Sequence, residues 1–316
     1  MKKLLLLFFL FYSIRTFAQV DYLFYHQLIN NAENHIANED FSNAQKQFNA
    51  TFQQFDYVFT KDYVIATQIA WLNKDTSQTK VWMEESIKNG YPCICFLRIP
   101  AMNTFMKTTA WQQIQIQADS LRRIYLASID LNLLVEWSRR YRDEQDAKST
   151  SRYPIIVQSN YDRIKALTDS LGFPSERFIG LDNARIAPNQ VNTISGLKDC
   201  DAANSKIMAT LLHYDNPITD LGFDRCAQAI RDGLLHPRQF ATIYTFERYE
   251  VSRINDKINK PNLPDYHFGF PLSEEEQDEE RINRDRTLFG IGSVKLDKQK
   301  EVVARKYGMR LDFGYK

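Results

Sequence analysis

Six polar residues in the second half of the chain have types and positions suited to chemistry or to ligand binding. They are Glu144, Gln145, Lys148, His213, Gln239 and Tyr244. A histidine gains or loses a proton near neutral pH and a carboxylate can orient it, so His213 and Glu144 are candidates for general acid–base work. The first four of the six lie toward the C-terminal ends of apolar helical stretches. We therefore predict that these four line one polar groove, with Gln239 and Tyr244 nearby.

The same residues also allow a purely structural interpretation. Glu144 and Lys148 are four positions apart, which is the spacing of an ion pair on a helix surface. A histidine at a helix end is often neutral and hydrogen-bonded. If the cluster is structural, His213→Ala should lower the melting temperature, because a buried polar partner loses its mate. If it is functional, the same change should leave stability nearly unchanged and abolish a ligand interaction.

Motifs of established catalytic or cofactor chemistry are missing from the sequence. There is no G-x-S-x-G, no H-E-x-x-H and no phosphate-binding loop. Gly290-Ile-Gly292 has no third glycine, which indicates a turn. Asp199-Cys-Asp201 begins like a calcium loop, but Thr210 stands where such a loop needs a glutamate. We therefore expect neither a cofactor nor a metal.

The cysteines Cys93, Cys95, Cys200 and Cys226 leave three interpretations open. They can be small buried apolar side chains. Alternatively, Cys200 and Cys226 can form a disulfide if the chain meets an oxidising compartment. A metal site is the third interpretation, although the C-x-C spacing of the first two differs from the C-x-x-C of zinc and redox sites.

Residues 1–18 have the pattern of a cleavable signal peptide. Two lysines precede an uncharged apolar run from Leu4 to Tyr12, and Thr16-Phe17-Ala18 supplies a cleavage site. The apolar run is far shorter than the ~20 residues that span a bilayer, although a short membrane anchor is an alternative. We predict cleavage before Gln19 and a secreted or periplasmic mature protein.

The balance of charge argues against two classes of partner. The chain has 40 Lys+Arg and 39 Asp+Glu, and loss of Lys2, Lys3 and Arg15 with the signal peptide leaves a net charge of about −2. A nucleic-acid partner normally requires a basic face. No later apolar run is long enough to span a bilayer. We expect a protein or peptide partner, no nucleic acid, and no membrane insertion after signal cleavage.

Apolar residues recur at helical spacing along most of the mature chain, and no convincing strand pattern occurs. The spacing predicts an all-α protein. The expected helices cover about 21–38, 40–52, 61–73, 76–89, 111–125, 131–148, a stretch ending at 171, 202–214, 220–231, 237–249 and 297–307.

The first half contains a weak repeat. Ala44-x-x-x-Phe48 aligns with Thr79-x-x-x-Met83 at an offset of 35 residues. A helix pair recurring about every 34 residues is typical of tetratricopeptide repeats, and residues 41–50 resemble the second helix of such a repeat. The Trp-Leu-Gly signature of the first helix is missing. Plain antiparallel hairpins that share a period by chance are the alternative.

Two further segments carry predictions. The segment 172–180 is expected to be a loop whose glycines allow a close approach to a ligand. Ser273-Glu-Glu-Glu276 is a capping box that would open a charged helix ending near Arg286. Because Ile282 is the only aliphatic residue from 274 to 286, we predict that this helix is peripheral. Deleting residues 260–316 should then leave the core folded.

Several motifs of the second half together resemble an uncharacterised family of bacterial domains. They are Glu144-Gln145-x-x-Lys148, Gly172-Phe-Pro174, Leu212-His213-Tyr214 and Ala229-Ile230-x-x-Gly233-x-x-x-Pro237. Members are often exported and often follow a tetratricopeptide-like region. The family usually has Asp-Gln-x-x-Arg as its first motif and an acidic residue where this chain has Thr245. The resemblance covers about 129–250 and implies no established activity.

These patterns divide the chain into four parts. They are a signal peptide (1–18), a tetratricopeptide-like region (19–128), a helical domain of unknown function (129–258) and a charged extension (259–316). Stacked helix pairs can offer a concave surface to a peptide or protein. We therefore predict an exported peptide- or protein-binding helical protein. The alternative is a hydrolase-like enzyme with its site around His213 and Glu144.

Overall fold

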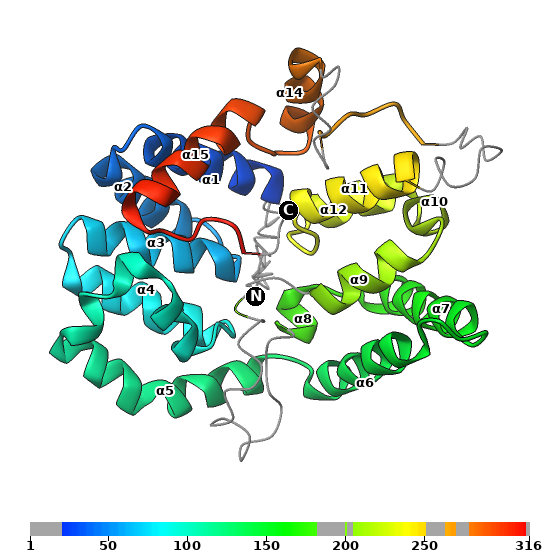
Figure 1. The fold of residues 1–316 in the computed structure, drawn as a ribbon, viewed down its shortest axis with the longest axis horizontal. Coiled ribbons are helices and arrows are strands. Elements are labelled where there is room, and N and C mark those ends of the chain that lie inside the picture. The colour runs from blue at the N-terminus through cyan, green and yellow to red at the C-terminus, as the bar shows by residue number, and fades with distance from the viewer. Residues whose placement is uncertain (1–20, 182–199, 201–204, 251–262, 270–277, 314–316) are drawn as a thin grey trace, which may run out of the picture.

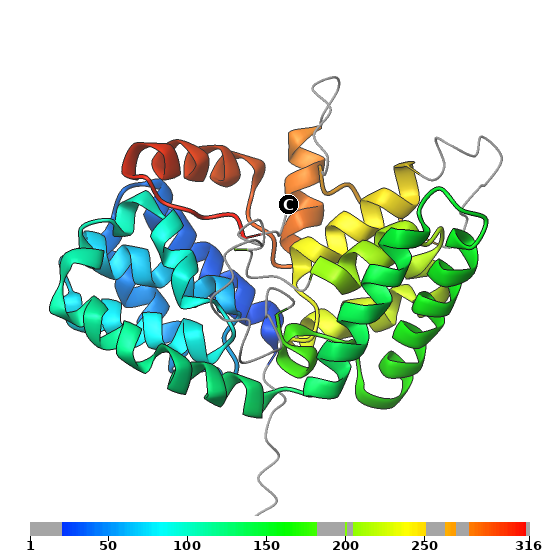
Figure 2. The ribbon, with the colours of Figure 1, turned by 60° about the horizontal axis from the view of Figure 1, so that its bottom comes forward.

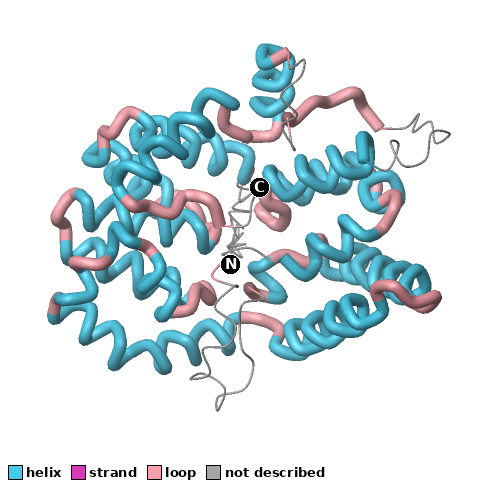
Figure 3. The backbone as a smooth tube through the Cα atoms, in the orientation of Figure 1, coloured by secondary structure: helices cyan, strands magenta, loops and turns pink. Residues whose placement is uncertain are grey.

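Every regular element in the part of the chain that the structure describes is a helix. The computed structural model describes residues 21–181, 200, 205–250, 263–269 and 278–313. Within these ranges the chain forms α-helices, short 3-10 helices and a π-helical turn, without strands (Figure 3). The all-α fold class predicted from helical spacing is therefore confirmed.

Two helix hairpins begin the fold. They are α1 (Tyr22–Ala37) with α2 (Phe41–Phe52), and α3 (Thr60–Leu72) with α4 (Thr76–Lys88) (Figure 1). Their turns are built alike: Glu39 and Lys74 take positive φ values of 59° and 62°, and the carboxylates of Asp40 and Asp75 then cap the following helices. A positive φ is uncommon outside glycine. The shared turn thus repeats at the same 35-residue offset as the apolar pattern.

Equivalent positions in the two hairpins are buried alike. Ala44 and Thr79 are both fully buried, as are Phe48 and Met83. A small residue followed one turn later by a large one allows the paired helices to approach closely while the gap between them is filled. The hairpins agree with the period read from the sequence, whereas their assignment as tetratricopeptide repeats stays a prediction.

A short irregular stretch and a long helix lead to the second half. The stretch contains η1 (Cys93–Arg98), η2 (Pro100–Met102) and η3 (Phe105–Lys107), and the helix is α5 (Thr109–Ser128). Helix α5 packs on α4 and contributes side chains to both hydrophobic cores. Its Leu121 belongs to the core of the first half, and its Tyr125 belongs to the core of the second half.

The rest of the chain also consists of helices of varied length. They are α6 (Leu131–Ala147), α7 (Tyr153–Leu171), α8 (Glu176–Ile179), α9 (Ser205–His213), α10 (Pro217–Leu221), α11 (Phe223–Arg231), α12 (Pro237–Thr245), η5 (Phe246–Glu250), α14 (Glu279–Leu288) and α15 (Val294–Tyr307). The expected helix over 220–231 is interrupted at Gly222, whose φ of 94° ends α10. The expected loop over 172–180 contains the short helix α8. Ser293 caps α15 and Gly308 ends it in the left-handed conformation, the stop that the sequence predicts.

The last part of the chain contributes side chains to both cores, which argues against the prediction that residues 260–316 can be deleted while the core stays folded. Helix α14 itself buries little besides Ile282 and Arg286. The residues after it, however, bury Phe289 and Ile291 in the second core and Val303 in the first. Figure 2 shows α15 lying over the first half, with α14 between the halves. The deletion prediction considered the charged helix and not the apolar residues that follow it.

One disulfide joins two distant segments. Cys95 in η1 is bonded to Cys200, 105 residues away, and both cysteines are buried. The Cys200–Cys226 disulfide, one of the three interpretations that the sequence leaves open, does not form, because Cys226 is a free thiol buried in the second core. Cys93 is also free.

Two predictions fall outside the described residues. These are the signal peptide over 1–18 and the capping box at Ser273. Among the residues that are described, no helix has both the length and the apolar character required to cross a membrane.

Candidate functional site

The structure brings Glu144 and His213 into direct contact. Nδ1 of His213 on α9 lies 2.5 Å from Oε1 of Glu144 on α6. The other carboxylate oxygen accepts hydrogen bonds from the Asn160 amide at 2.7 Å and from the Thr210 hydroxyl at 3.1 Å. Glu144 is fully buried, whereas the His213 side chain keeps 23% of its surface exposed. The cluster therefore has a buried anchor and a partly accessible imidazole.

This arrangement fixes how the imidazole is presented. Burial alone would raise the pKa of the Glu144 carboxyl, but hydrogen bonds from His213, Asn160 and Thr210 outweigh burial and lower that pKa. An ionised carboxylate only accepts hydrogen bonds, so Nδ1 of His213 carries the proton. Nε2 is then the nitrogen that can accept a proton or bind a ligand. The centroid of the Tyr153 ring lies 5.9 Å from the centroid of the imidazole.

Sequence reasoning found two members of this cluster and missed two. Thr210 precedes His213 by three residues, so both occupy one face of α9, and this spacing could have revealed it. Asn160 lies on α7 and had no comparable signal, because its position depends on how α7 packs against α6 and α9.

The other four predicted residues do not join the pair. Lys148 is exposed at the end of α6. Gln145 is half-buried, and its Nε2 has no hydrogen-bond partner among the described residues. Gln239 is buried on α12. The hydroxyl of Tyr244 donates to the carbonyl of Pro264, which fastens the 263–269 segment to α12.

At both glycines of the 172–180 segment, a neighbouring side chain occupies the space that a Cβ would need. A Cβ at Gly172 would lie 2.9 Å from the Leu234 side chain, and one at Gly180 would overlap the hydroxyl of Tyr125. That hydroxyl accepts a hydrogen bond from the Leu181 backbone at 2.6 Å. The close approach expected here is thus to side chains of the protein itself.

A second feature, not expected from the sequence, is the way residues 308–313 lie on the first half. The amide of Gln68, fully buried on α3, pairs with the Arg310 backbone: it donates to the carbonyl and accepts from the N–H, both at 2.8 Å. The Gly308 carbonyl accepts from Ala101 at 2.9 Å. This non-helical stretch, which we call the 308–313 segment, is therefore held by its backbone.

Two apolar side chains anchor the same segment. Met309 and Phe313 are buried in the core of the first half, and the Phe313 ring meets the Tyr91 ring edge-on at 5.9 Å. The guanidinium of Arg310 covers the Phe313 ring and donates to the Cys200 carbonyl at 2.7 Å. The segment thus contacts the first half much as a bound peptide would.

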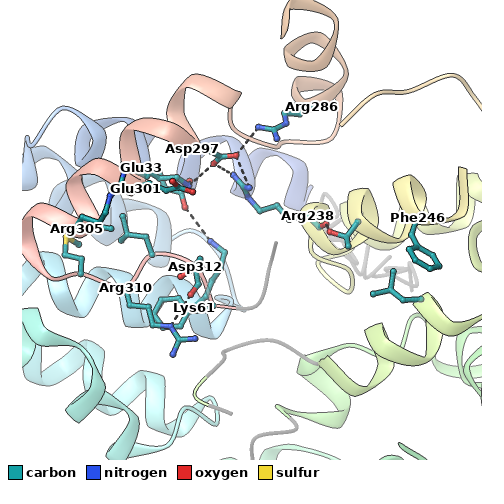
Figure 4. Close-up of a pocket in the computed structure, with 17 residues that line it drawn as sticks. Glu33, Lys61, Arg238, Phe246, Arg286, Asp297, Glu301, Arg305, Arg310 and Asp312 are labelled. Atoms are coloured by element: carbon teal, nitrogen blue, oxygen red, sulfur yellow. Dashed lines mark hydrogen bonds and ion pairs between the residues drawn. The ribbon is translucent and has the colours of Figure 1, made fainter. Parts of the chain in front are cut away.

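The third feature is a charged cavity of about 820 Å³ between the two halves (Figure 4). Its wall is formed by α1, α3, α9, α12, η5, α14, α15 and the 308–313 segment. Several of its charged residues are deeply buried, among them Glu33, Lys61 and Arg286. Sequence reasoning missed this site because its residues come from elements far apart in the chain.

Comparison of the chain with protein-family models, with curated proteins and with solved structures gave no match in any of the three. Within the described residues, no group of three histidine, cysteine or carboxylate side chains is placed to hold a metal ion.

Proposed function

We propose that this chain is an exported peptide-binding protein whose first half receives an extended peptide. The observation that carries the proposal is the pairing of Gln68 with both backbone groups of Arg310. Backbone pairing gives affinity that does not depend on the side chains of the bound segment. The surface that holds the 308–313 segment would therefore accept other extended peptides.

The anchors of the segment suggest which peptides bind. Met309 and Phe313 are four positions apart and both are buried, whereas Leu311 and Asp312 between them are not fully buried. In peptide recognition, pockets for particular side chains provide the specificity that the backbone lacks. The preferred partner is thus a peptide with an apolar residue followed, four positions later, by an aromatic one.

Two observations support the location and the repeat assignment in this proposal. Disulfides persist in exported proteins and are rare in the cytosol, so the Cys95–Cys200 bond agrees with the signal peptide expected over residues 1–18. The recurrence of the turn at Glu39 and Lys74 agrees with tetratricopeptide-like hairpins. The secreted or periplasmic location and the resemblance of the second half belong to the same proposal.

A displayed peptide library would test the binding specificity. The bait is the mature chain ending at Tyr307, which frees the surface under the 308–313 segment, and the matched control carries Gln68→Ala. We expect enrichment of peptides with the apolar–aromatic spacing on the bait and not on the control. Equal enrichment on both would overturn the proposal.

A hydrolase-like enzyme is the second candidate function, and the Glu144–His213 contact favours it. A buried carboxylate on Nδ1 is the arrangement that orients a catalytic histidine, because it stabilises the imidazolium formed when Nε2 takes a proton. In this candidate, Nε2 of His213 would take a proton from an attacking water. An activated nucleophilic side chain is not part of it.

Hydrolysis of activated carboxyl and phosphate esters would test this candidate. Activity should disappear in His213→Ala and persist in His35→Ala, since His35 lies on the exposed side of α1. Equal activity in the two variants would dismiss the enzyme.

A further inference from the structure

The side chain of Arg310 divides its contacts between the 308–313 segment and the surface that holds this segment. Its Nη1 donates a hydrogen bond to the backbone carbonyl of Cys200, on the surface, at 2.7 Å. Its Nε donates to the backbone carbonyl of Asp312, within the segment, at 3.2 Å. The guanidinium carbon lies 4.8 Å from the centroid of the Phe313 ring. The half-buried guanidinium therefore uses both its N–H donors and one of its faces.

The acceptor on the surface belongs to a residue that is fastened covalently. Cys200 is 1% exposed, and its disulfide attaches it to Cys95 in η1. Both cysteines are part of the core of the first half, together with Met309 and Phe313, the two apolar anchors of the segment. The Cys200 carbonyl thus lies within the surface that receives the anchors, opposite the residue that follows the first anchor.

The chemistry of these contacts favours arginine over other side chains. A backbone carbonyl only accepts hydrogen bonds, so it favours a donor at this position and disfavours a carboxylate. A guanidinium is planar, offers several donors in a fixed arrangement and stacks on aromatic rings, whereas the ammonium group of lysine is a compact charge. A cation over the face of an aromatic ring adds further attraction. Lysine can reproduce the charge but not the combined contacts, and glutamine lacks the charge.

We propose that the peptide-binding surface selects arginine directly after the apolar anchor. This inference rests on the proposed peptide-binding function and narrows its ligands to peptides of the form apolar–Arg–x–x–aromatic. The arginine of the bound peptide would donate to the Cys200 carbonyl and cover the aromatic anchor of the same peptide, as Arg310 covers Phe313.

Fluorescence anisotropy with the full chain tests this selection. The probes are labelled peptides with the sequence of residues 308–316 that carry arginine, lysine or glutamine at position 310. All of them compete with the same 308–313 segment of the protein, so the ratios of their Kd values report the side chain at position 310. We expect the glutamine peptide to bind about five- to tenfold more weakly than the arginine peptide, with the lysine peptide between them. A control peptide with Lys316→Gln loses the same charge elsewhere and should bind like the arginine peptide.

The protein's own segment provides an independent measurement. The backbone N–H of Arg310 donates to the side chain of Gln68, so its hydrogen exchange reports how firmly the segment is held. After correction for the intrinsic rate at each residue, Arg310→Gln in the full chain should speed this exchange about five- to tenfold. Lys295→Gln, at an exposed position on α15, should leave the rate unchanged.

The outcomes separate this selection from the peptide-binding function on which it rests. Equal Kd values for the arginine and glutamine peptides, or an unchanged exchange rate in Arg310→Gln, would overturn the selection of arginine and leave the peptide-binding surface in place. Failure of all the peptides to bind would instead contradict the proposed function, and this inference with it.

Discussion

The ammonium group of Lys300 lies 2.5 Å from the carboxylate of Glu33, although 267 residues separate them. Both side chains are buried, so this ion pair fastens α15 to α1 inside the molecule. A second pair between the same parts of the chain, Lys306 with Glu39, has the same sequence separation but lies at the surface. The two pairs form a natural comparison.

Lys300→Met should lower the free energy of unfolding by about 3 kcal/mol, because Glu33 then loses its closest partner inside the protein. Lys306→Met should leave the free energy of unfolding nearly unchanged, because its pair is exposed to water and salt. Urea denaturation of both variants measures the difference. Similar losses in the two variants would contradict the description of the buried pair.

The Glu144 cluster predicts a pH-dependent contribution to stability. Glu144→Gln should lower the free energy of unfolding at pH 7 by about 1–3 kcal/mol, since buried donors lose a charged acceptor. The pKa of Glu144 is lowered in the folded state, so its contribution is present above the unfolded pKa and disappears as pH falls through the folded pKa. The deficit of the variant should therefore shrink in acid. Asp143→Asn, at an exposed neighbouring position, should show no such deficit.

Two buried histidines predict that stability falls in mild acid. His26 and His236 meet with ring centroids 5.0 Å apart, and burial lowers the pKa of both well below the usual value. The unfolded chain takes up protons below about pH 6.5 and the folded chain does not, so stability decreases as pH falls from there. Each histidine should contribute a slope of up to about 1.4 kcal/mol per pH unit.

His236→Asn tests this slope with little change in structure. The neutral Nδ1 of His236 accepts a hydrogen bond from Arg238 at the start of α12, and asparagine is a favoured residue at this position. Between pH 6.5 and 5, the free energy of unfolding of the variant should depend less steeply on pH, and the difference should equal about the contribution of one histidine. Retention of the full slope in thermal unfolding would show that His236 is not protonated on unfolding.

The disulfide predicts how many thiols react in the denatured chain and how much the bond contributes to the free energy of unfolding. The unreduced, denatured chain should react as two thiols, Cys93 and Cys226. Replacing both Cys95 and Cys200 by alanine should lower the free energy of unfolding by about 2–5 kcal/mol. Four reactive thiols in protein recovered from an oxidising compartment would contradict the bond.

The local spacing of apolar residues predicted the helices, and the position of polar residues at helix ends predicted part of the candidate site. Helical spacing predicted the helix over about 131–148, where α6 buries Leu134 and Trp137. Helix-end position was the ground for expecting Glu144 and His213 in one site. The helices depend only on residues within one or two turns, so their prediction needed no knowledge of how distant elements pack. The Glu144–His213 contact spans 69 residues, and the sequence supplied only the helix-end position of each partner.

Long-range relationships could not be read from the sequence. The partner of Cys200 depends on the path of the chain, and nothing in its spacing distinguishes Cys95 from Cys226. The pairing of Gln68 with Arg310 spans 242 residues. Leu288 and Phe289 look alike in the sequence, yet the first is 57% exposed and the second is buried. Only tertiary packing separates such cases.

A fluorescence anisotropy titration tests the central claim, that the first half binds an extended peptide. The probe is a labelled peptide with the sequence of residues 308–316. The protein consists of residues 19–307, with its fold checked by circular dichroism. We predict saturable binding that weakens at least about fivefold with Gln68→Ala, and equally with a peptide carrying proline at position 310, which has no N–H to donate. The full chain should bind the probe more weakly, because its own segment competes at a high effective concentration. Absence of saturable binding to the folded chain ending at Tyr307, or binding that neither substitution weakens, would contradict the claim.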